Sequence, residues 1–325
     1  MPTPLLQVRN LTTRFNTEQG QVTAVDGVSF DIDAGETVAI VGESGSGKSV
    51  TALSIMRLIP SPPGKIESGE IVFEGRDLSR IDDAGMRAIR GNKIAMIFQE
   101  PMSSLNPALT VGMQVAEPSN LHRGLPWAKA MDLARELLGR VRIPDAASRL
   151  ASYPHQYSGG MRQRVMIAMA LACQPRLIIA DEPTTALDVT VQAQILDLLK
   201  ELTRETGSSL LLITHDLGVV ARYADRVAVM YGGRIVETAP ARELYRHPHH
   251  PYTLGLMASV PRLDGDAGGQ LVPIEGQPPD LAHLPPGCAF SPRCGKASDA
   301  CREARPPLVE VAARHFKACF NDVRA

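Results

Sequence analysis

Short runs of apolar residues alternate along this chain with segments whose apolar residues recur at helical spacing. Thr37–Val41 is an apolar run bounded by Gly35 and Gly42, and Leu177–Ala180 and Leu210–Thr214 are two further runs of this kind. Apolar runs of roughly four to eight residues with flanking turn residues are typical of strands buried on both faces. The pattern therefore predicts three strands in the interior of a sheet.

The segment between the second and third runs predicts an amphipathic helix. Its apolar residues recur at positions i, i+4, i+7, i+8 and i+11, which lie on one face of a helix: Val191, Ile195, Leu198, Leu199 and Leu202. Asp188 can cap the start of this helix and Gly207 can end it. Further on, Val227–Tyr231 and Arg234–Glu237 flank a pair of glycines, which predicts a β-hairpin. Strands that alternate with helices indicate an α/β fold with a largely parallel sheet and ligands at the strand ends.

Composition excludes several classes of protein. The chain has 325 residues, which suggests about two domains at roughly 150 residues each, and its net charge of −1 argues against a protein held to nucleic acid by phosphate contacts. The longest near-apolar run, Val165–Cys173, is far shorter than the roughly 20 residues that a membrane-spanning helix needs. The N-terminus shows no apolar signal region, so we expect a cytoplasmic protein, in which disulfides are rare.

Proline marks a domain boundary. Residues 240–325 hold 12 of the 25 prolines of the chain and few long periodic segments. We predict one domain over residues 1–246 and a loop-rich C-terminal extension over residues 247–325.

A glycine-rich motif predicts a phosphate-binding loop. Residues 42–49, which we call the phosphate loop, match G-x-x-x-x-G-K-[ST] and lie between a predicted strand and a helix. Glycines let successive N–H groups approach phosphate oxygens, and the helix N-terminus favours an anion. We expect Lys48 to hold the β and γ phosphates of ATP and Ser49 to ligate Mg²⁺. The nucleotide-binding residues predicted here are Gly42, Ser44, Gly45, Gly47, Lys48 and Ser49.

Two carboxylates after a strand complete the pattern of a P-loop NTPase. The strand predicted at Leu177–Ala180 begins 128 residues after Ser49 and ends in Asp181 and Glu182. Asp181 is expected to bind Mg²⁺ through water, and Glu182 to orient or deprotonate the attacking water. A GTPase needs an Asn-Lys-x-Asp element, and the only Asn-Lys pair, Asn92-Lys93, is followed by Ile and Ala.

Ser158, Gly159 and Gly160 precede a helical segment, and Gly160 lies 21 residues before Asp181. With the motifs above, this element makes essentially the whole chain resemble the nucleotide-binding subunit of an ABC transporter. The resemblance implies a RecA-like core with a helical subdomain at about residues 100–165. It also implies that the Ser-Gly-Gly element contacts the γ-phosphate bound to a second subunit. Tyr157 stands where the family usually has Leu, and Met161 where it has Gln.

The resemblance assigns roles to further residues. Gln99 corresponds to the Q-loop residue that links Mg²⁺ and water to the membrane subunit, and Ala186-Leu187-Asp188 corresponds to the D-loop, which communicates across the dimer. His215 corresponds to the switch histidine at the γ-phosphate. Phe15 corresponds to the aromatic residue on which adenine stacks. Glu182, His215 and Gln99 are thus the implied catalytic residues.

Three segments look like the dipeptide and oligopeptide importer group: Ile97–Pro107, Ala180–Val189 and His250–Thr253. This resemblance implies the ATP-hydrolysing motor of a peptide importer, bound to the cytoplasmic face of the membrane. Its implied partners are a second, homologous ATPase subunit, two membrane permeases and an extracytoplasmic peptide-binding protein. Nickel and glutathione importers share much of the pattern and remain alternatives. A non-transport ABC ATPase is a further alternative, which the single P-loop and the absence of a long heptad run disfavour.

Four cysteines crowd the C-terminal extension with the spacing C-x5-C-x6-C-x17-C: Cys288, Cys294, Cys301 and Cys319. Soft sulfur ligands suit zinc and iron–sulfur centres, although no C-x2-C pair is present, and four free thiols are the alternative. The resemblance implies a structural [4Fe–4S] cluster, with Zn²⁺ as the second possibility. Cys173 is predicted as buried packing, and His247, His249 and His250 as part of a solvated loop.

Overall fold

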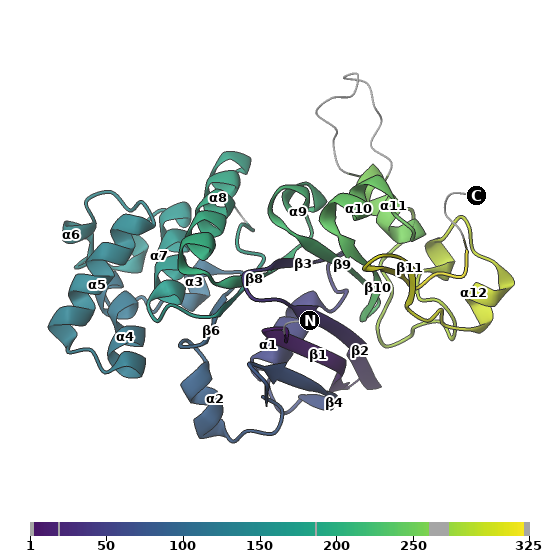
Figure 1. Ribbon diagram of the computed structural model, residues 1–325, viewed down its shortest axis with the longest axis horizontal. Helices are drawn as coiled ribbons and strands as arrows, with labels where there is room; N and C mark the ends of the chain where they lie inside the picture. The colour runs from purple at the N-terminus through teal and green to yellow at the C-terminus, as the bar shows by residue number, and fades with distance from the viewer. Residues whose placement is uncertain (1–2, 19, 186, 260–272, 322–325) are drawn as a thin grey trace. The chain divides into compact units, whose positions relative to one another are not determined.

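The computed structural model describes residues 3–18, 20–185, 187–259 and 273–321. The chain divides into two units (Figure 1). The first unit comprises residues 1–32, 37–79 and 213–325, and the second comprises residues 33–36 and 80–212.

The first unit contains a four-stranded antiparallel sheet in the order β2-β1-β4-β5. Its strands are β1 (Leu6–Thr17), β2 (Gly20–Ile32), β4 (Gly64–Phe73) and β5 (Arg76–Asp77). Buried and partly exposed residues alternate along β1, as expected for a strand with one face on the core. The sequence analysis did not predict this sheet, because shifts in register near Leu11 and Thr13 interrupt the alternation.

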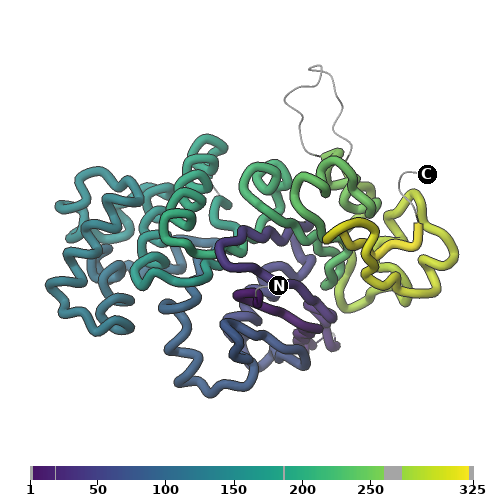
Figure 2. The backbone as a smooth tube through the Cα atoms, in the orientation of Figure 1, coloured from purple at the N-terminus to yellow at the C-terminus, as the bar shows by residue number. Residues whose placement is uncertain are grey.

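A second sheet in the first unit carries the phosphate loop. The strands of this sheet that lie wholly in the first unit are β3 (Thr37–Val41), β9 (Arg226–Tyr231), β10 (Arg234–Pro240), β11 (Val309–Ala312) and β12 (His315–Lys317), in the order β11-β12-β10-β9-β3. β3 and β9 are parallel, and β9 and β10 form the predicted antiparallel hairpin. The C-terminal extension adds β12 and β11 beside β10, as the yellow end of the trace shows in Figure 2. The helices of this unit are α1 (Lys48–Ile55), α9 (Leu217–Tyr223), α10 (Ala241–Arg246), α11 (Pro251–Ala258), η2 (Ser291–Arg293) and α12 (Asp299–Glu303).

The second unit is mainly helical. Strands β6 (Ile94–Ile97) and β7 (Leu177–Asp181) run parallel, and β8 (Ser209–Thr214) follows β7 in the sheet, its last two residues belonging to the first unit. Its helices are α2 (Asp83–Ile89), α3 (Pro101–Ser104), α4 (Val111–Arg123), α5 (Trp127–Arg140), α6 (Ala146–Arg149), η1 (Pro154–Gln156), α7 (Gly159–Leu171) and α8 (Val189–Thr206). Helices α4, α5 and α7 pack on one another (Figure 1).

Helix α8 confirms the predicted amphipathic helix. The Asp188 side chain caps it by accepting a hydrogen bond from the Val191 N–H at 2.9 Å, and Gly207 ends it with a φ of 66°. Ile195, Leu198, Leu199 and Leu202 are buried, whereas Val191 is only half-buried. The strands predicted at Thr37–Val41, Leu177–Ala180 and Leu210–Thr214 are also present, as β3, β7 and β8.

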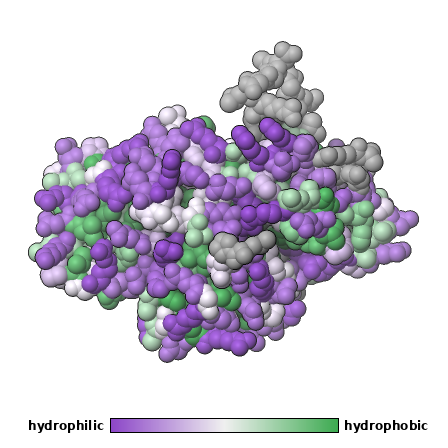
Figure 3. All heavy atoms as spheres, in the orientation of Figure 1, coloured by the Kyte–Doolittle hydropathy of each residue, from purple (hydrophilic) through white to green (hydrophobic). Residues whose placement is uncertain are grey.

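Hydrophilic and hydrophobic residues are interspersed over the face shown in Figure 3. Large apolar side chains that remain exposed in the C-terminal extension include Leu308, Val309, Val311 and Phe320. None of the described helices combines the length and the apolar character needed to cross a lipid bilayer.

Candidate functional site

The backbone of the phosphate loop has a conformation that requires glycine. Gly42, Gly45 and Gly47 all have positive φ. At Gly47 φ is 102°, and a Cβ there would lie 2.3 Å from the carbonyl oxygen of Ala24. No L side chain fits this position, because it would need both a strained backbone and a displaced neighbouring strand. Gly47 is also the N-cap of α1, so the amides of the first turn of α1 lie directly after the loop.

Lys48 is buried beneath its own loop. Its side chain is 4% exposed, and Nζ donates hydrogen bonds to the carbonyl oxygens of Gly42 at 2.8 Å and Glu43 at 2.9 Å. The ammonium group therefore lies inside the curve of the loop. Ser49 follows it as the second residue of α1 and is half-buried.

Two other predicted nucleotide contacts belong to the same unit. Phe15 lies on β1, is half-buried, and faces Gly64, where a Cβ would come within 2.7 Å of the ring atom Cε1. His215 is exposed and directly follows β8, before α9. Asp216, the N-cap of α9, accepts a hydrogen bond from the Gly218 N–H at 2.7 Å. The predicted roles of Phe15 in stacking and His215 in switching stay predictions.

In the second unit, the predicted hydrolytic carboxylate has two hydrogen-bond donors. Gln99 Nε2 donates to Glu182 Oε2 at 3.0 Å, and Thr185 Oγ1 donates to the same oxygen at 2.9 Å. Gln99 and Glu182 are 83 residues apart in the sequence. Glu182 has a φ of 45°, and Asp181 before it is buried at the end of β7. The sequence analysis missed Thr185, which its position three residues after Glu182 could have suggested.

The Ser-Gly-Gly element forms the start of α7. Ser158 is exposed and caps this helix by accepting a hydrogen bond from the Met161 N–H at 3.3 Å. Gly160 packs closely on α8, since a Cβ there would lie 2.9 Å from Val191 Cγ1. The element thus presents a hydroxyl and a helix N-terminus at the surface of the second unit, as an anion site requires.

Tyr157, the departure from the family pattern, is 3% exposed, and its hydroxyl donates a hydrogen bond to the Arg149 carbonyl oxygen at 2.8 Å. Burial raises the pKa of Tyr157, and the nearby Arg149 guanidinium partly offsets that rise. The Tyr157 ring is therefore held in the interior, while Ser158, the next residue, remains exposed. Of the predicted D-loop, Asp188 is the cap of α8, whereas Ala186 lies outside the described residues.

The predicted site residues divide between the two units. The phosphate loop, Phe15 and His215 belong to the first, and the remaining ones belong to the second: Gln99, Ser158, Gly159, Gly160, Asp181, Glu182 and Asp188.

The four cysteines of the C-terminal extension interact electrostatically. Burial raises the pKa of Cys288, Cys294 and Cys319, and other cysteines of the same four raise each of these pKa values further. The Cys288 N–H donates a hydrogen bond to the carbonyl oxygen of Cys301 at 2.8 Å. Over the part of the chain that the structure describes, however, no three His, Cys, Asp or Glu side chains are arranged to hold a metal ion. The spacing suggested a metal site, but the arrangement of the four cysteines does not support the predicted [4Fe–4S] cluster or Zn²⁺ site.

Two other side-chain predictions have different outcomes. Cys173 is buried, as predicted, and its Sγ donates a hydrogen bond to the Pro118 carbonyl oxygen at 3.3 Å. The prediction of a solvated loop is wrong for His250, which is 1% exposed. Its Nδ1 accepts a hydrogen bond from the Tyr252 N–H at 3.1 Å and so caps α11, and burial lowers the pKa of His250 to about 4. Sequence alone gave no sign of this cap.

A buried carboxylate on β10 anchors the histidines. Glu237 accepts hydrogen bonds from the His249 N–H at 2.6 Å, the His250 N–H at 3.0 Å and His315 Nε2 at 2.7 Å. Glu237 is 0% exposed and His315 is 1% exposed. One side chain thus joins β10, the residues before α11 and β12.

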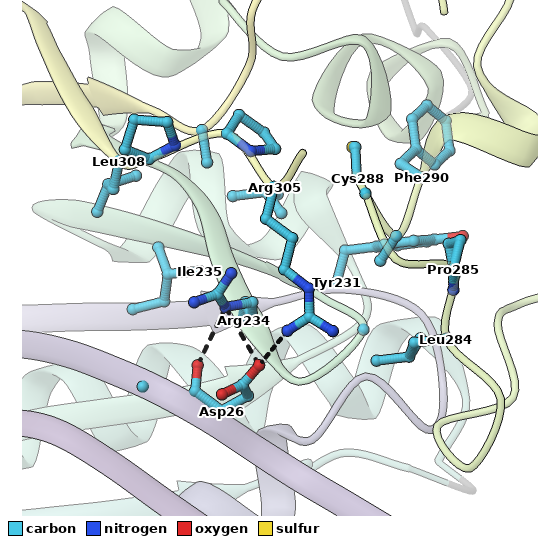
Figure 4. Close-up of a pocket in the computed structure, with 18 of the residues that line it drawn as sticks. Asp26, Tyr231, Arg234, Ile235, Leu284, Pro285, Cys288, Phe290, Arg305 and Leu308 are labelled. Atoms are coloured by element: carbon cyan, nitrogen blue, oxygen red, sulfur yellow. Dashed lines mark hydrogen bonds and ion pairs between the residues drawn. The ribbon is translucent and has the colours of Figure 1, made fainter. Parts of the chain in front are cut away.

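A cavity of about 600 Å³ lies where the C-terminal extension meets β2, β9 and β10 (Figure 4). At its charged end, Asp26 Oδ2 lies 2.8 Å from Arg305 Nη1 and 3.5 Å from Arg234 Nε. The opposite wall includes Leu284, Pro285 and Phe290 of the C-terminal extension. The sequence analysis did not anticipate this cavity, because its walls come from distant parts of the chain.

Comparison with known proteins agrees with this geometry. Residues 25–185 match the ABC transporter family, and residues 236–301 match the oligopeptide/dipeptide transporter C-terminal region. The chain is 53% identical to the dipeptide transport ATP-binding protein DppD of Bacillus subtilis, over 99% of this chain and 96% of that protein. It is also 53% identical to the oligopeptide transport ATP-binding protein OppD of Haemophilus influenzae, over 98% of this chain and 97% of that protein.

Among solved structures, the chain resembles a dimeric post-hydrolysis state of the ATP-binding cassette MJ0796 bound to ADP and Pi. The TM-score is 0.66 at 32% identity, over 73% of this chain and 99% of that one. The match supports the predicted α/β cassette fold. Near-full-length identity of this size, together with the two family matches, shows that the chain belongs to the ABC transporter family as one of its ATP-binding proteins.

Proposed function

We propose that this protein is the ATP-hydrolysing subunit of an importer for dipeptides and oligopeptides. The observation that carries the proposal is the phosphate loop, in which the buried Lys48 lies within a turn that requires glycine. The names of the relatives, which are dipeptide and oligopeptide transport ATP-binding proteins, support the choice of cargo.

The phosphate loop is proposed to bind ATP through its backbone N–H groups and Lys48. When a phosphate arrives, Lys48 Nζ can exchange one of its two carbonyl partners for a phosphate oxygen, because a hydrogen bond to a charged acceptor is stronger than one to a carbonyl oxygen. Phe15 is proposed to stack on adenine. Mg²⁺, when bound with the nucleotide, would offset charge on the β and γ phosphates, and Ser49, Gln99 and Asp181 are the residues proposed to hold it.

Glu182 is proposed to orient or deprotonate the attacking water. Hydrogen bonds from Gln99 and Thr185 orient its carboxylate in the present arrangement, and a general base must be oriented towards the water that it activates. His215 is proposed to contact the γ-phosphate.

A second ATPase subunit is proposed to complete each ATP site. Ser158 is exposed at the N-terminus of α7, in the unit that does not contain the phosphate loop. An exposed helix N-terminus of this kind suits an anion bound to a partner. The related cassette MJ0796 is dimeric. Asp188 is proposed to communicate across this dimer, and a homologous but different chain is the proposed partner.

The remaining proposed partners are two membrane permeases and an extracytoplasmic peptide-binding protein, with this chain bound peripherally on the cytoplasmic face. The test is reconstitution of all components in liposomes, followed by measurement of ATP hydrolysis and uptake of a labelled dipeptide. We expect uptake that requires ATP and an intact Lys48. Uptake of nickel or glutathione in place of peptides would overturn the choice of cargo, and absence of ATP hydrolysis would overturn the motor itself.

We also propose a metal centre at Cys288, Cys294, Cys301 and Cys319, with a [4Fe–4S] cluster favoured and Zn²⁺ as the alternative. The proposal rests on the donor set and not on a preformed geometry. Burial and neighbouring cysteines raise the pKa of Cys288, Cys294 and Cys319, and a bound cation would offset the repulsion among thiolates. A loop-rich segment also gains folding energy from such a site.

The metal content of anaerobically purified protein tests this proposal. We expect about four iron atoms per chain and a loss of iron in each single Cys→Ser variant of the four, because a cubane cluster needs four thiolates. The matched control is Cys173→Ser, which should keep its iron, since Cys173 lies in the turn after α7 and not in the C-terminal extension. A content of one zinc and no iron per chain would show that Zn²⁺ is the cofactor and not the cluster. The absence of both metals would mean that the four cysteines are free thiols.

A further inference from the structure

A charged pair ties the C-terminal extension to the phosphate loop. Arg293, in η2, donates to both carboxylate oxygens of Glu43, with Nη1 to Oε2 at 2.7 Å and Nη2 to Oε1 at 3.0 Å. The two residues are 250 positions apart in the sequence. Glu43 is the second residue of the phosphate loop, and both residues belong to the first unit.

The Arg293 guanidinium is held by a full set of acceptors. Nη1 also donates to the Tyr231 hydroxyl at 3.3 Å, Nε donates to the Glu275 carbonyl oxygen at 2.9 Å, and Nη2 donates to the Ile274 carbonyl oxygen at 3.3 Å. These contacts account for all five N–H groups of the side chain. Since the side chain is only 6% exposed, its position is fixed by packing as well as by hydrogen bonds.

Glu43 is held at its backbone as well. Its N–H donates a hydrogen bond to the Tyr252 hydroxyl at 2.8 Å, and its carbonyl oxygen accepts from Lys48 Nζ at 2.9 Å. Rings pack behind these contacts: the Tyr231 centroid is 4.5 Å from that of Tyr252 and 5.2 Å from that of Phe290. Of these contacts to Glu43, the Tyr252 and Arg293 contacts come from the C-terminal extension.

The sign of the charges gives this contact a consequence for nucleotide binding. A carboxylate within the phosphate loop repels the polyphosphate of ATP, and the repulsion is strong where water is excluded. A bidentate guanidinium offsets the charge of that carboxylate and holds it in one position. The same contact restrains Glu43, whose carbonyl oxygen accepts a hydrogen bond from Lys48 Nζ.

We propose that Arg293 is a positioning residue for ATP: by pairing with Glu43, it lets the C-terminal extension set the nucleotide affinity of the phosphate loop. The inference deepens the proposed function and rests on it only in taking residues 42–49 as the nucleotide site. Arg293 itself touches no substrate. Its effect is on affinity and not on the hydrolytic carboxylate, which belongs to the other unit.

The test uses the full-length chain and four variants: Arg293→Gln, Glu43→Gln, the double variant, and Arg302→Gln as the matched control. Arg302 also belongs to the C-terminal extension and pairs with Asp299, but its side chain is 63% exposed. Titration with a fluorescent ATP analogue gives Kd, and the reconstituted complex gives KM and kcat for ATP. For Arg293→Gln we expect Kd and KM to rise about tenfold with kcat within about threefold, as loss of uniform binding predicts. Arg302→Gln should stay within about twofold, since exposed ion pairs contribute little.

The double variant separates charge pairing from a purely structural role. With no carboxylate left to neutralise, its Kd should return to within about threefold of Glu43→Gln alone, a non-additive result that coupled residues give. Strict additivity of the two single changes would overturn the proposal, as would an Arg293→Gln protein with wild-type Kd. If the wild-type chain itself bound no ATP, the proposed function would fail instead, so the two failures are distinguishable.

Should Arg293→Gln fail to fold, Arg293→Lys carries the test. Lysine keeps the charge but cannot donate to both carboxylate oxygens in one plane. We expect a rise in Kd of about threefold, smaller than for complete loss of the bidentate pair. An unchanged Kd in a folded Arg293→Lys protein would overturn the proposal.

Discussion

The phosphate loop and the group around Glu182 are built in opposite ways. The phosphate loop is made of backbone, closes over a lysine that is 4% exposed, and tolerates no side chain at Gly47. The Glu182 group is made of side chains: Gln99 is exposed, and Glu182 is half-buried. A site formed by backbone is complete before ligand arrives, whereas one formed by partly exposed side chains can be rearranged at low cost. If these two groups have the proposed roles, the difference teaches that ATP capture is preorganised and that hydrolysis is the step more open to control.

The strongest test of this contrast is Glu182→Gln. The amide keeps the shape and loses the basicity, so kcat should fall by about 10²–10⁴-fold, the contribution of a positioned general base, with ATP still bound. Single-turnover hydrolysis in the reconstituted complex measures the effect. Glu201→Gln, at an exposed carboxylate paired with Arg142, is the matched control and should turn over normally. Near-normal turnover of Glu182→Gln would assign the base elsewhere.

The converse change, Lys48→Ala, should act on binding. Losing charge-assisted hydrogen bonds to phosphate should raise the Kd of ATP by about 10–100-fold, since each such bond contributes roughly 1.5–3 kcal/mol. Equilibrium titration of the purified chain measures this effect. Lys65→Ala, on the exposed part of β4, is the control and should bind normally. A Lys48→Ala protein with wild-type affinity would mean that the buried lysine serves only the fold of the loop.

Ser158→Arg tests whether the Ser-Gly-Gly element of one subunit acts on the ATP bound at the phosphate loop of another. The chain should bind ATP normally but lose about tenfold or more in hydrolysis once assembled, because a bulky cation replaces the anion-binding cap. Thr110→Arg is the matched control, since Thr110 also caps a helix of the second unit by accepting from the Met113 N–H. If the isolated Ser158→Arg chain lost as much ATP affinity as the Lys48→Ala chain, action of Ser158 across a dimer would be ruled out.

The smallest expected effect concerns pH. The pKa of His250 is about 4 in the folded protein, below the unfolded value of about 6.5, so the unfolded state takes up the proton first. Stability from this group is therefore present above pH 6.5 and is lost as pH falls towards 4, by about 2 kcal/mol between pH 7.5 and pH 5.

Asparagine at position 250 can still cap α11 but does not titrate. The free energy of unfolding of His250→Asn should therefore change by about 2 kcal/mol less than that of the wild type between pH 7.5 and pH 5. Denaturant unfolding at the two pH values measures this. His247→Asn, at an exposed position, should keep the wild-type dependence. Because Tyr252 of α11 supports Glu43, acid should weaken ATP binding in the wild type before it disturbs the Glu182 group. An identical pH dependence in the wild type and His250→Asn would contradict this account.

The sequence predicted what local rules determine. Thr37–Val41 and Leu177–Ala180 are strands because every residue except Thr37 is apolar and the flanking residues end the run. The phosphate loop follows from its own eight residues. The contacts between distant residues were beyond such rules. Gln99 meets Glu182 across 83 positions, and Arg293 meets Glu43 across 250. The four cysteines show the limit most clearly, because their spacing suggested a shared metal site but contained no information on their arrangement in space.

The buried Glu237 bears on how such a chain could be lengthened or shortened in evolution. With His315 removed, Glu237 would stay fully buried and would keep, among the contacts of the described residues, the N–H donors of His249 and His250. Leaving a buried polar group short of a hydrogen-bond partner costs roughly 1–3 kcal/mol, a considerable part of the stability of an ordinary domain. A version of this chain without the tail is therefore expected to fold better with an apolar residue at this position of β10. The acid and the tail that supplies His315 would then be easier to replace together than one at a time.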